Sequence, residues 1–223
     1  MKFITDNLQD WADKISAEID RDEGQHDWFW PKSSEHEIFE QAWMKFVNRN
    51  LNYFAFDSMI ASVKEGNEFN KALPITLEFC RHVRTLSTVH AKSPFGRMCV
   101  WKLPPGKRLL PHRDNYNYHR FITRNIFVIS DNDDDSMIIN IEGKPAPCKK
   151  GALWQFHPDV ELHEFHNTSS DRPFFFLGFD FWDERKLVAL QSLVDHEKLA
   201  NDPVRMNTFG GGLGKKSKYI SAH

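Results

Sequence analysis

The chain has 223 residues, of which 40% are hydrophobic, and its 29 lysines and arginines nearly balance 31 aspartates and glutamates. This length and composition are sufficient for one domain with a sizeable core. The formal net charge of -2 gives no electrostatic reason to expect binding to nucleic acid or to a membrane surface.

The cysteines and the N-terminus bear on the compartment. Cys80, Cys99 and Cys148 are an odd, widely spaced set without a Cys-x-x-Cys pair, which predicts reduced thiols rather than disulfides or a zinc site. The first residues lack the apolar segment of a signal peptide, and no stretch approaches about 18 apolar residues. We therefore expect a cytoplasmic protein that does not span a membrane.

Residues 1–95 are predicted to be a helical casing within the same domain. Apolar residues recur at helical spacing in the stretches 8–19, 38–47 and 74–89. Two capping boxes mark helix starts: Asp6 with Gln9, and Ser34 with Glu37.

Residues 96–183 change to short apolar runs separated by turns. Many short strands at close intervals are typical of an all-β sandwich or barrel, so we predict a mainly β core with flanking helices. The expected strands cover residues 97–103, 109–112, 124–130, 137–141, 152–156, 162–166 and 173–182.

A C-terminal helix is predicted within residues 184–207. Its buried side would carry Leu187, Leu190, Leu193 and Val194. Residues 208–223 are rich in glycine and lysine, which predicts a flexible tail.

A candidate metal site begins at His112 and Asp114. Residues two apart on a strand point to the same side, so both side chains can reach one metal. In the run 162–167, strand alternation places His163 and Phe165 on one face and His166 on the other, so only one histidine can face inward. Two histidines and one carboxylate are the ligand set of the non-haem Fe(II) oxygenases.

We choose His163 as the third ligand because a polar turn at 169–171 then leads to Arg172. We expect a hairpin in which Arg172 lies on the strand next to His163, within reach of the metal face. Arginine is suited to gripping a carboxylate through two hydrogen bonds.

Residues 97–183 resemble the catalytic domain of the aspartyl/asparaginyl β-hydroxylase family of Fe(II)/2-oxoglutarate dioxygenases. The matching segments occur in the order of the family: residues 103–114, 123–128, 151–156 and 163–172. The resemblance implies a double-stranded β-helix, the cupin-like jelly roll, over residues 96–183.

The resemblance also implies roles for single residues. Iron would be held by His112, Asp114 and His163, with no further catalytic residue, and Arg172 would bind the distal C5 carboxylate of 2-oxoglutarate. Arg124 would contact the carboxylate nearer the metal, with a structural ion pair as the equal alternative. His119 and Arg120 lie close enough in sequence to exchange roles with Arg124.

Asp114 is a departure within the family, because the animal peptidyl-aspartate hydroxylases lack this carboxylate. The chain therefore resembles the microbial amino-acid hydroxylases more closely, and Asp114 argues against halogenation. We expect O2-dependent hydroxylation of an unactivated C–H bond in a small amino-acid-like substrate, releasing succinate and CO2. The alternatives are a peptidyl Asp/Asn β-hydroxylase and a non-catalytic cupin-like metal-binding or regulatory protein.

The sequence does not indicate which substrate is used or what the oligomeric state is. Asn115, Tyr116 and Tyr118 follow the metal motif and are candidate substrate contacts, although a polar turn explains them at least as well. Trp154, Phe165 and Phe174 are candidates for a dry wall of the site, and ordinary core packing explains these equally.

Overall fold

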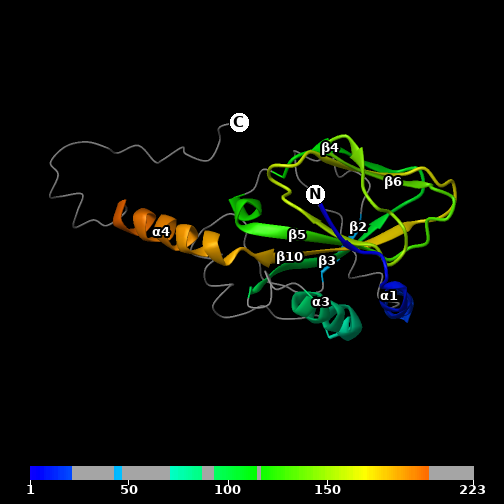
Figure 1. Cartoon of the computed structure of the whole chain (residues 1–223), viewed down its shortest axis with the longest axis horizontal. Coiled ribbons are helices and arrows are strands. Elements are labelled where there is room, and N and C mark those ends of the chain that lie inside the picture. The colour runs from blue at the N-terminus through cyan, green and yellow to red at the C-terminus, as the bar shows by residue number, and fades with distance from the viewer. Residues whose placement is uncertain (22–42, 47–70, 87–92, 115–116, 201–223) are drawn as a thin grey trace.

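The computed structural model describes residues 1–21, 43–46, 71–86, 93–114 and 117–200. Two antiparallel sheets face each other, and helices α1 and α3 lie against the outer face of the larger one (Figure 1). The larger sheet has the strand order β1-β8-β5-β10-β3-β2, and the smaller has the order β4-β9-β6-β7.

The elements have the following bounds. The larger sheet contains β1 (Lys2–Thr5), β2 (Trp43–Phe46), β3 (Phe95–Leu103), β5 (Ile122–Val128), β8 (Leu153–Phe156) and β10 (Phe174–Trp182). The smaller sheet contains β4 (Arg108–His112), β6 (Met137–Ile141), β7 (Lys144–Pro145) and β9 (His163–Asn167). The helical elements are α1 (Gln9–Arg21), α3 (Pro74–Leu86), the 3-10 helix η2 (Asn117–Phe121) and α4 (Glu184–Ala200).

The strands from β3 to β10 form a jelly roll. Apart from the β6–β7 hairpin, each successive strand lies in the opposite sheet, so neighbours in a sheet come from distant parts of the sequence. This arrangement confirms the predicted double-stranded β-helix core. It also leaves a space between the sheets into which both can project side chains.

Alternation along β3 shows how the two faces of the larger sheet are used. Met98 and Val100 pack in the cluster shared with α1 and α3, whereas Cys99 and Trp101 pack between the sheets. Successive strand residues point to opposite faces, so one strand serves both cores. The same alternation in β5 and β10 brings inward-facing residues of three adjacent strands together.

Two of the three helices predicted in the first 95 residues are confirmed, as α1 and α3. Most of the second predicted helix lies outside the described residues, but Trp43–Phe46 forms strand β2, so the helical prediction was wrong there. β1 was not predicted either. Both four-residue strands are edge strands that pair with a neighbour distant in sequence, and such pairing leaves no local signal.

The predicted hairpin between His163 and Arg172 does not form. β9 pairs with β4 and β6, whereas β10 lies in the other sheet between β5 and β3. The chain crosses between sheets after Asn167, whose side-chain amide donates to the carbonyls of Leu103, Pro104 and Arg172 at 3.0, 3.2 and 2.8 Å. These hydrogen bonds from one amide group brace the crossing.

Helix α4 extends beyond the sheets from the end of β10 (Figure 1). Leu190 and Val194 are buried as predicted, but Leu193 is 42% exposed, so its predicted burial was wrong. The apolar side of α4 is therefore narrower than the sequence pattern indicates. The predicted tail, residues 208–223, lies outside the described residues.

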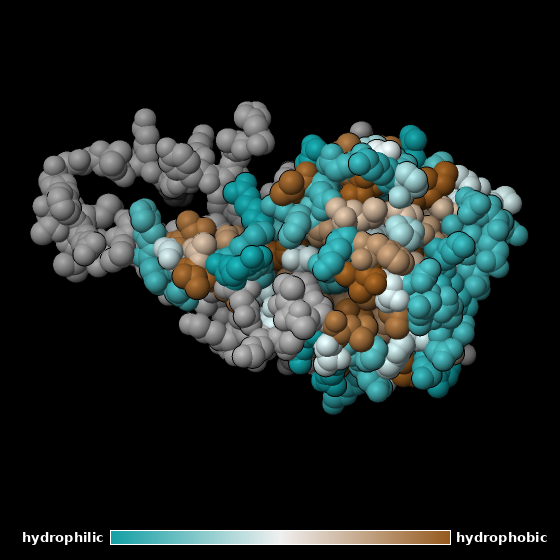
Figure 2. Space-filling view, viewed as in Figure 1, coloured by the Kyte–Doolittle hydropathy of each residue, from teal (hydrophilic) through white to brown (hydrophobic). Residues whose placement is uncertain are grey.

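On the face seen in Figure 2, a group of apolar residues over the sheets is surrounded by hydrophilic ones. Phe3 on β1 and Ile138 on β6 are among the exposed large apolar residues. None of the helices in the described ranges is long and apolar enough to cross a membrane. All three cysteines are free thiols, as predicted.

Glu18 joins the two casing helices. Its buried carboxylate accepts hydrogen bonds from the backbone N–H groups of Ile75 and Thr76, at 2.6 and 2.8 Å, and from the Thr76 hydroxyl at 2.6 Å. These donors lie in the first turn of α3, whose N–H groups have no partner within the helix. Glu18 therefore supplies from α1 the cap that α3 lacks.

We expect Glu18→Ala to lower the free energy of unfolding by about 2–4 kcal/mol, because buried donors lose their acceptor. Urea unfolding measures the change. Glu78→Ala, at an exposed position of α3, is the matched control and should change stability by less than about 0.5 kcal/mol. Equal effects of the two substitutions would show that the carboxylate of Glu18 does not join the helices.

Candidate active site

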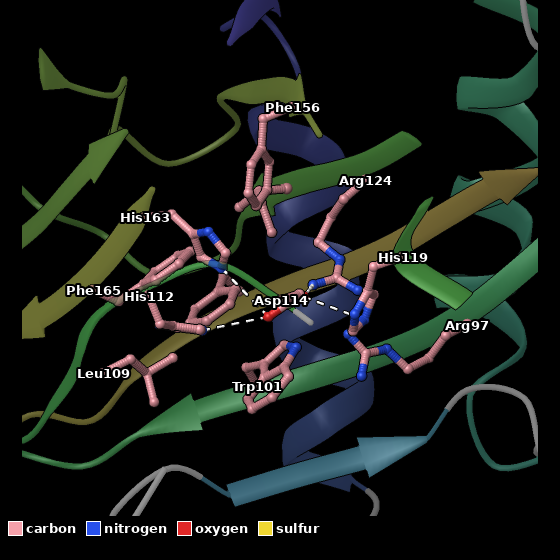
Figure 3. A pocket seen from close by; sticks show the side chains of 12 residues that line it. Arg97, Trp101, Leu109, His112, Asp114, His119, Arg124, Phe156, His163 and Phe165 are labelled. Atoms are coloured by element: carbon pink, nitrogen blue, oxygen red, sulfur yellow. Dashed lines mark hydrogen bonds and ion pairs between the residues drawn. The ribbon is translucent and has the colours of Figure 1, made fainter. Parts of the chain in front are cut away.

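A cavity of about 60 Å³ opens between the two sheets, close to the end of β4 (Figure 3). From the side of the smaller sheet, β4 contributes His112, the loop after β4 contributes Asp114, and β9 contributes His163. The larger sheet contributes charged residues at one end of the cavity and apolar residues at the other. The full lining is Arg97, Trp101, Leu109, His112, Asp114, His119, Arg124, Ile126, Phe156, His163, Phe165 and Phe176.

Pairing of β4 with β9 brings the two predicted histidine ligands together. His112 is the register partner of His163, and their ring centroids are 4.3 Å apart. Asp114 follows the end of β4, where its backbone N–H donates to the carbonyl of Pro158 at 2.8 Å. One donor atom from each of the three residues lies within 4.8 Å of the others, so one metal ion can contact all three.

Both imidazoles are oriented by backbone carbonyls. His112 Nδ1 lies 2.7 Å from the carbonyl oxygen of Leu110, and His163 Nδ1 lies 2.9 Å from that of Glu161. Because a carbonyl oxygen only accepts, each Nδ1 must carry the proton, and each Nε2 keeps its lone pair for a metal. Outer partners of this kind fix the tautomer and ring orientation of histidine ligands in metal sites.

The two oxygens of Asp114 face different partners. Oδ1 lies 3.5 Å from His112 Nε2 and 3.7 Å from His163 Nε2. Oδ2 accepts a hydrogen bond from Arg124 Nη1 at 2.5 Å and lies 3.2 Å from His119 Nε2. The carboxylate therefore offers Oδ1 to the same point in space as the two Nε2 atoms.

Electrostatics favour the metal-binding form of two of these residues, Asp114 and His163. Burial opposes ionisation of Asp114, but the neighbouring His119 and Arg124 hold the pKa of the carboxyl well below its usual range. Burial lowers the pKa of His163 to about 4, although Asp114 acts in the opposite direction. Metal ligands must be deprotonated, so the site is prepared for a cation at neutral pH.

A buried ion network continues from Asp114 into the larger sheet. Arg124 is held by Asp180, with Nε donating to Oδ1 at 2.9 Å and Nη2 donating to Oδ2 at 3.1 Å. Arg97 Nε lies 3.9 Å from Asp180 Oδ2. Figure 3 shows Arg97, His119 and Arg124 on one side of Asp114 and His112 and His163 on the other.

Sequence reasoning missed Arg97 and Asp180. The sequence did contain a signal for Asp180. It lies on a strand whose other residues are nearly all apolar, and it shares a strand face with Gly178 and Phe176, which are two and four positions away. A charged residue on the inward face of a buried strand is rare unless it is paired. The same argument applies to Arg97, which alternates with Cys99 and Trp101.

Stacked aromatic rings form the apolar side of the cavity. Phe165 and Phe176 stack at 4.8 Å with an interplanar angle of 11°, and Trp101 stacks on Phe176 at 6.1 Å and 9°. The prediction that Phe165 lines the site is thus supported by its position. Trp154 and Phe174 are buried in the core and do not line the cavity.

The remaining predicted residues lie away from the cavity. Arg172 pairs on the surface with Asp134, and its side chain is 49% exposed. The change of sheet after Asn167 carries it away from the position that the expected hairpin would give. Tyr118 is buried behind the site, and Arg120 is exposed. Asn115 and Tyr116 lie outside the described residues.

Comparison with known families agrees with this geometry. A family model described as aspartyl/asparaginyl beta-hydroxylase matches residues 9–184. The chain belongs to the aspartyl/asparaginyl β-hydroxylase family. The match begins in α1, so the casing helices belong to the family domain together with the strands. The chain is therefore an enzyme of the Fe(II)/2-oxoglutarate-dependent class.

Solved structures support the fold. A Pseudomonas putida prolyl-4-hydroxylase is similar at a TM-score of 0.54 and 13% identity, over 79% of this chain and 88% of the other. A Trichoplax adhaerens prolyl hydroxylase, in complex with a hypoxia-inducible-factor peptide, is similar at 0.56 and 10%, over 82% and 84%. A 2-oxoglutarate-dependent epimerase from nogalamycin biosynthesis is similar at 0.50 and 12%, over 78% and 74%. No curated protein sequence matched.

The pKa of His163 predicts an acid-sensitive fold in the metal-free protein. An unfolded histidine titrates near pH 6.5, so between about pH 6.5 and 4 the unfolded chain binds a proton that folded His163 excludes. Stability should therefore fall as the pH drops through this window, by about 3 kcal/mol from this residue. Urea unfolding in the presence of a chelator measures it. His163→Asn should give a shallower dependence, and an unchanged slope would contradict the assignment.

Proposed function

We propose that the protein hydroxylates an unactivated C–H bond of a small amino-acid-like substrate and releases succinate and CO2. The observation that carries this proposal is the convergence of His112 Nε2, Asp114 Oδ1 and His163 Nε2 in the cavity between the sheets. Two histidines and one carboxylate on one side of a metal leave other positions open, as non-haem Fe(II) oxygenases require. When bound there, Fe(II) with 2-oxoglutarate and O2 supplies the oxidising chemistry.

Charge balance supports a dicarboxylate cosubstrate. Arg97 and Arg124 carry two positive charges, and Asp114 and Asp180 carry two negative charges, so these four side chains sum to zero. A divalent cation would add two positive charges to a buried site, and an uncompensated buried charge is costly. The dianion 2-oxoglutarate restores neutrality.

Arg97 is the better-placed partner for the distal carboxylate of 2-oxoglutarate. The family resemblance assigns this role to Arg172, which lies on the surface, whereas Arg97 lines the cavity. Arg124 also lines it, and its Nε, Nη1 and Nη2 donate to Asp180 and Asp114, which suits a structural ion-pair role. We therefore assign the distal carboxylate to Arg97 and the structural ion-pair role to Arg124.

The aromatic side of the cavity would keep the reaction dry. Trp101, Phe165 and Phe176 present ring faces and edges with few polar atoms, so they exclude water and strengthen the electrostatic contacts of the charged side. A narrow, dry cavity of this kind suits the placement of one C–H group of the substrate beside the metal.

Asp114 supports a small amino-acid-like substrate over a protein side chain. The animal peptidyl-aspartate hydroxylases of the family lack a carboxylate ligand, whereas this chain has Asp114 beside His112 and His163. A peptidyl Asp/Asn hydroxylase remains the second candidate, because the similar Trichoplax enzyme is complexed with a peptide. A non-catalytic cupin-like protein is the third, and it would show no turnover of 2-oxoglutarate.

The decisive experiment incubates the purified protein with Fe(II), 2-oxoglutarate and air, with a panel of free amino acids and short peptides containing Asp or Asn. We expect succinate together with one amino acid that gains a single oxygen by mass spectrometry. Asp114→Ala should abolish both, and Asp134→Ala, which removes an exposed carboxylate, should not. Oxidation of peptides alone would favour the second candidate, and no succinate under any condition would refute the proposal.

The two arginine assignments make opposite predictions. Arg97→Ala should raise the KM for 2-oxoglutarate by about ten- to a hundredfold, since a charged hydrogen bond is worth about 1.5–3 kcal/mol. Arg172→Ala should change this KM by less than about twofold, because an exposed ion pair contributes little. Steady-state kinetics of succinate formation measures both. A large effect of Arg172→Ala alone would return the role to Arg172.

A further inference from the structure

Asp180 is a buried carboxylate that the proposed chemistry does not use directly. It lies on the inward face of β10, directly opposite Arg124 of β5 in the strand register. Only 1% of its surface is exposed. A buried charge of this kind is tolerated only where it is paired, and one of its partners, Arg124, links it to Asp114.

The contacts of Arg124 divide between two carboxylates. Nε and Nη2 donate to the two oxygens of Asp180, and Nη1 donates to Asp114 Oδ2 at 2.5 Å. A two-point contact fixes the plane of a guanidinium, which a single hydrogen bond does not. The direction in which Nη1 points at Asp114 is therefore set by Asp180.

Tyr118 holds Asp180 from the other side. Its hydroxyl donates to Asp180 Oδ2 at 3.0 Å and accepts from the backbone N–H of Arg97 at 2.6 Å. A Cβ on Gly96 would lie 2.3 Å from this hydroxyl, so the space around it is filled. A continuous chain of hydrogen bonds thus runs from β3 through Tyr118, Asp180 and Arg124 to Asp114.

We propose that Asp180 is a positioning residue: through Arg124 it occupies Oδ2 of Asp114 and so restricts that carboxylate to a single metal-binding oxygen, Oδ1. Carboxylates bind metals through one oxygen or two. Keeping Asp114 to one oxygen preserves the open positions that a cosubstrate and O2 need. The inference rests on the proposed function, because it assumes a metal at His112, Asp114 and His163.

The test measures Co(II) binding to the metal-free protein, by titration and by the Co(II) absorption spectrum. Asp180→Asn should weaken Co(II) binding by about 10–100-fold, the usual cost of losing an outer partner, and should change the spectrum. Arg124→Gln should have a similar effect. The double variant should bind no more weakly than Arg124→Gln alone, since Asp180 acts through Arg124.

Glu18→Gln is the matched control. Glu18 is also a buried carboxylate with three donors, but it joins α1 to α3. It should lower the urea midpoint and leave Co(II) affinity unchanged. Should Asp180→Asn fail to fold, Tyr118→Phe removes one hydrogen bond to Asp180 and should weaken binding by about twofold to fivefold.

Unchanged Co(II) affinity and spectrum in folded Asp180→Asn, or in Tyr118→Phe if that variant has to be used, would overturn the proposal. Additive losses in the double variant would also overturn it, because they would show that Asp180 does not act through Arg124. A wild-type protein that binds Co(II) at the three ligands but forms no succinate would contradict the proposed function. That result would not affect the conclusion drawn from the Co(II) affinities of the wild-type protein and its variants.

Discussion

The pairing of β4 with β9 is the constraint on which the site depends. It sets His112 opposite His163 and carries Asp114 just past the strand end, where the Pro158 carbonyl holds its backbone. A shift of one residue in this register would turn one histidine to the outer face of the smaller sheet, because strand side chains alternate. The apolar partners on β6 and β9 that pack between the sheets stabilise the observed register.

The charged half of the cavity is stable because its charges compensate each other. Asp114, Arg124 and Asp180 are each almost fully buried, and removing any one would leave the buried charges of the others unbalanced. The aromatic stack opposite them excludes water from the same space. The jelly roll thus separates a polar and an apolar half within one cavity, which is the arrangement that an oxidising metal and a C–H substrate both require.

The candidate metal-binding residues were largely predictable because most of their signals are local. The two-residue spacing of His112 and Asp114, and the alternation that lets only one of His163 and His166 face inward, depend only on the period of a strand. The choice of His163 was argued from a hairpin to Arg172 that does not form, and it is the pairing of β9 with β4 that brings His163 to His112. The place of Arg172 was not predictable in this way. Nine residues separate it from His163, and whether they form a hairpin or a crossing between sheets depends on pairing with strands elsewhere. The local sequence does not indicate whether a hairpin or a crossing between sheets forms.

The sequence by itself determined most strands of the core, the helices α1, α3 and α4, and His112 and Asp114 as side chains that can hold a metal, because hydrophobic period and residue chemistry are local properties. Only the tertiary structure decided which charges surround them. Arg97, Arg124 and Asp180 come from three strands separated by 27 and 56 residues in the chain, and they meet because β3, β10 and β5 are neighbours in one sheet. Backbone pairing between distant segments brings such residues together, and their positions in the sequence do not indicate which segments pair.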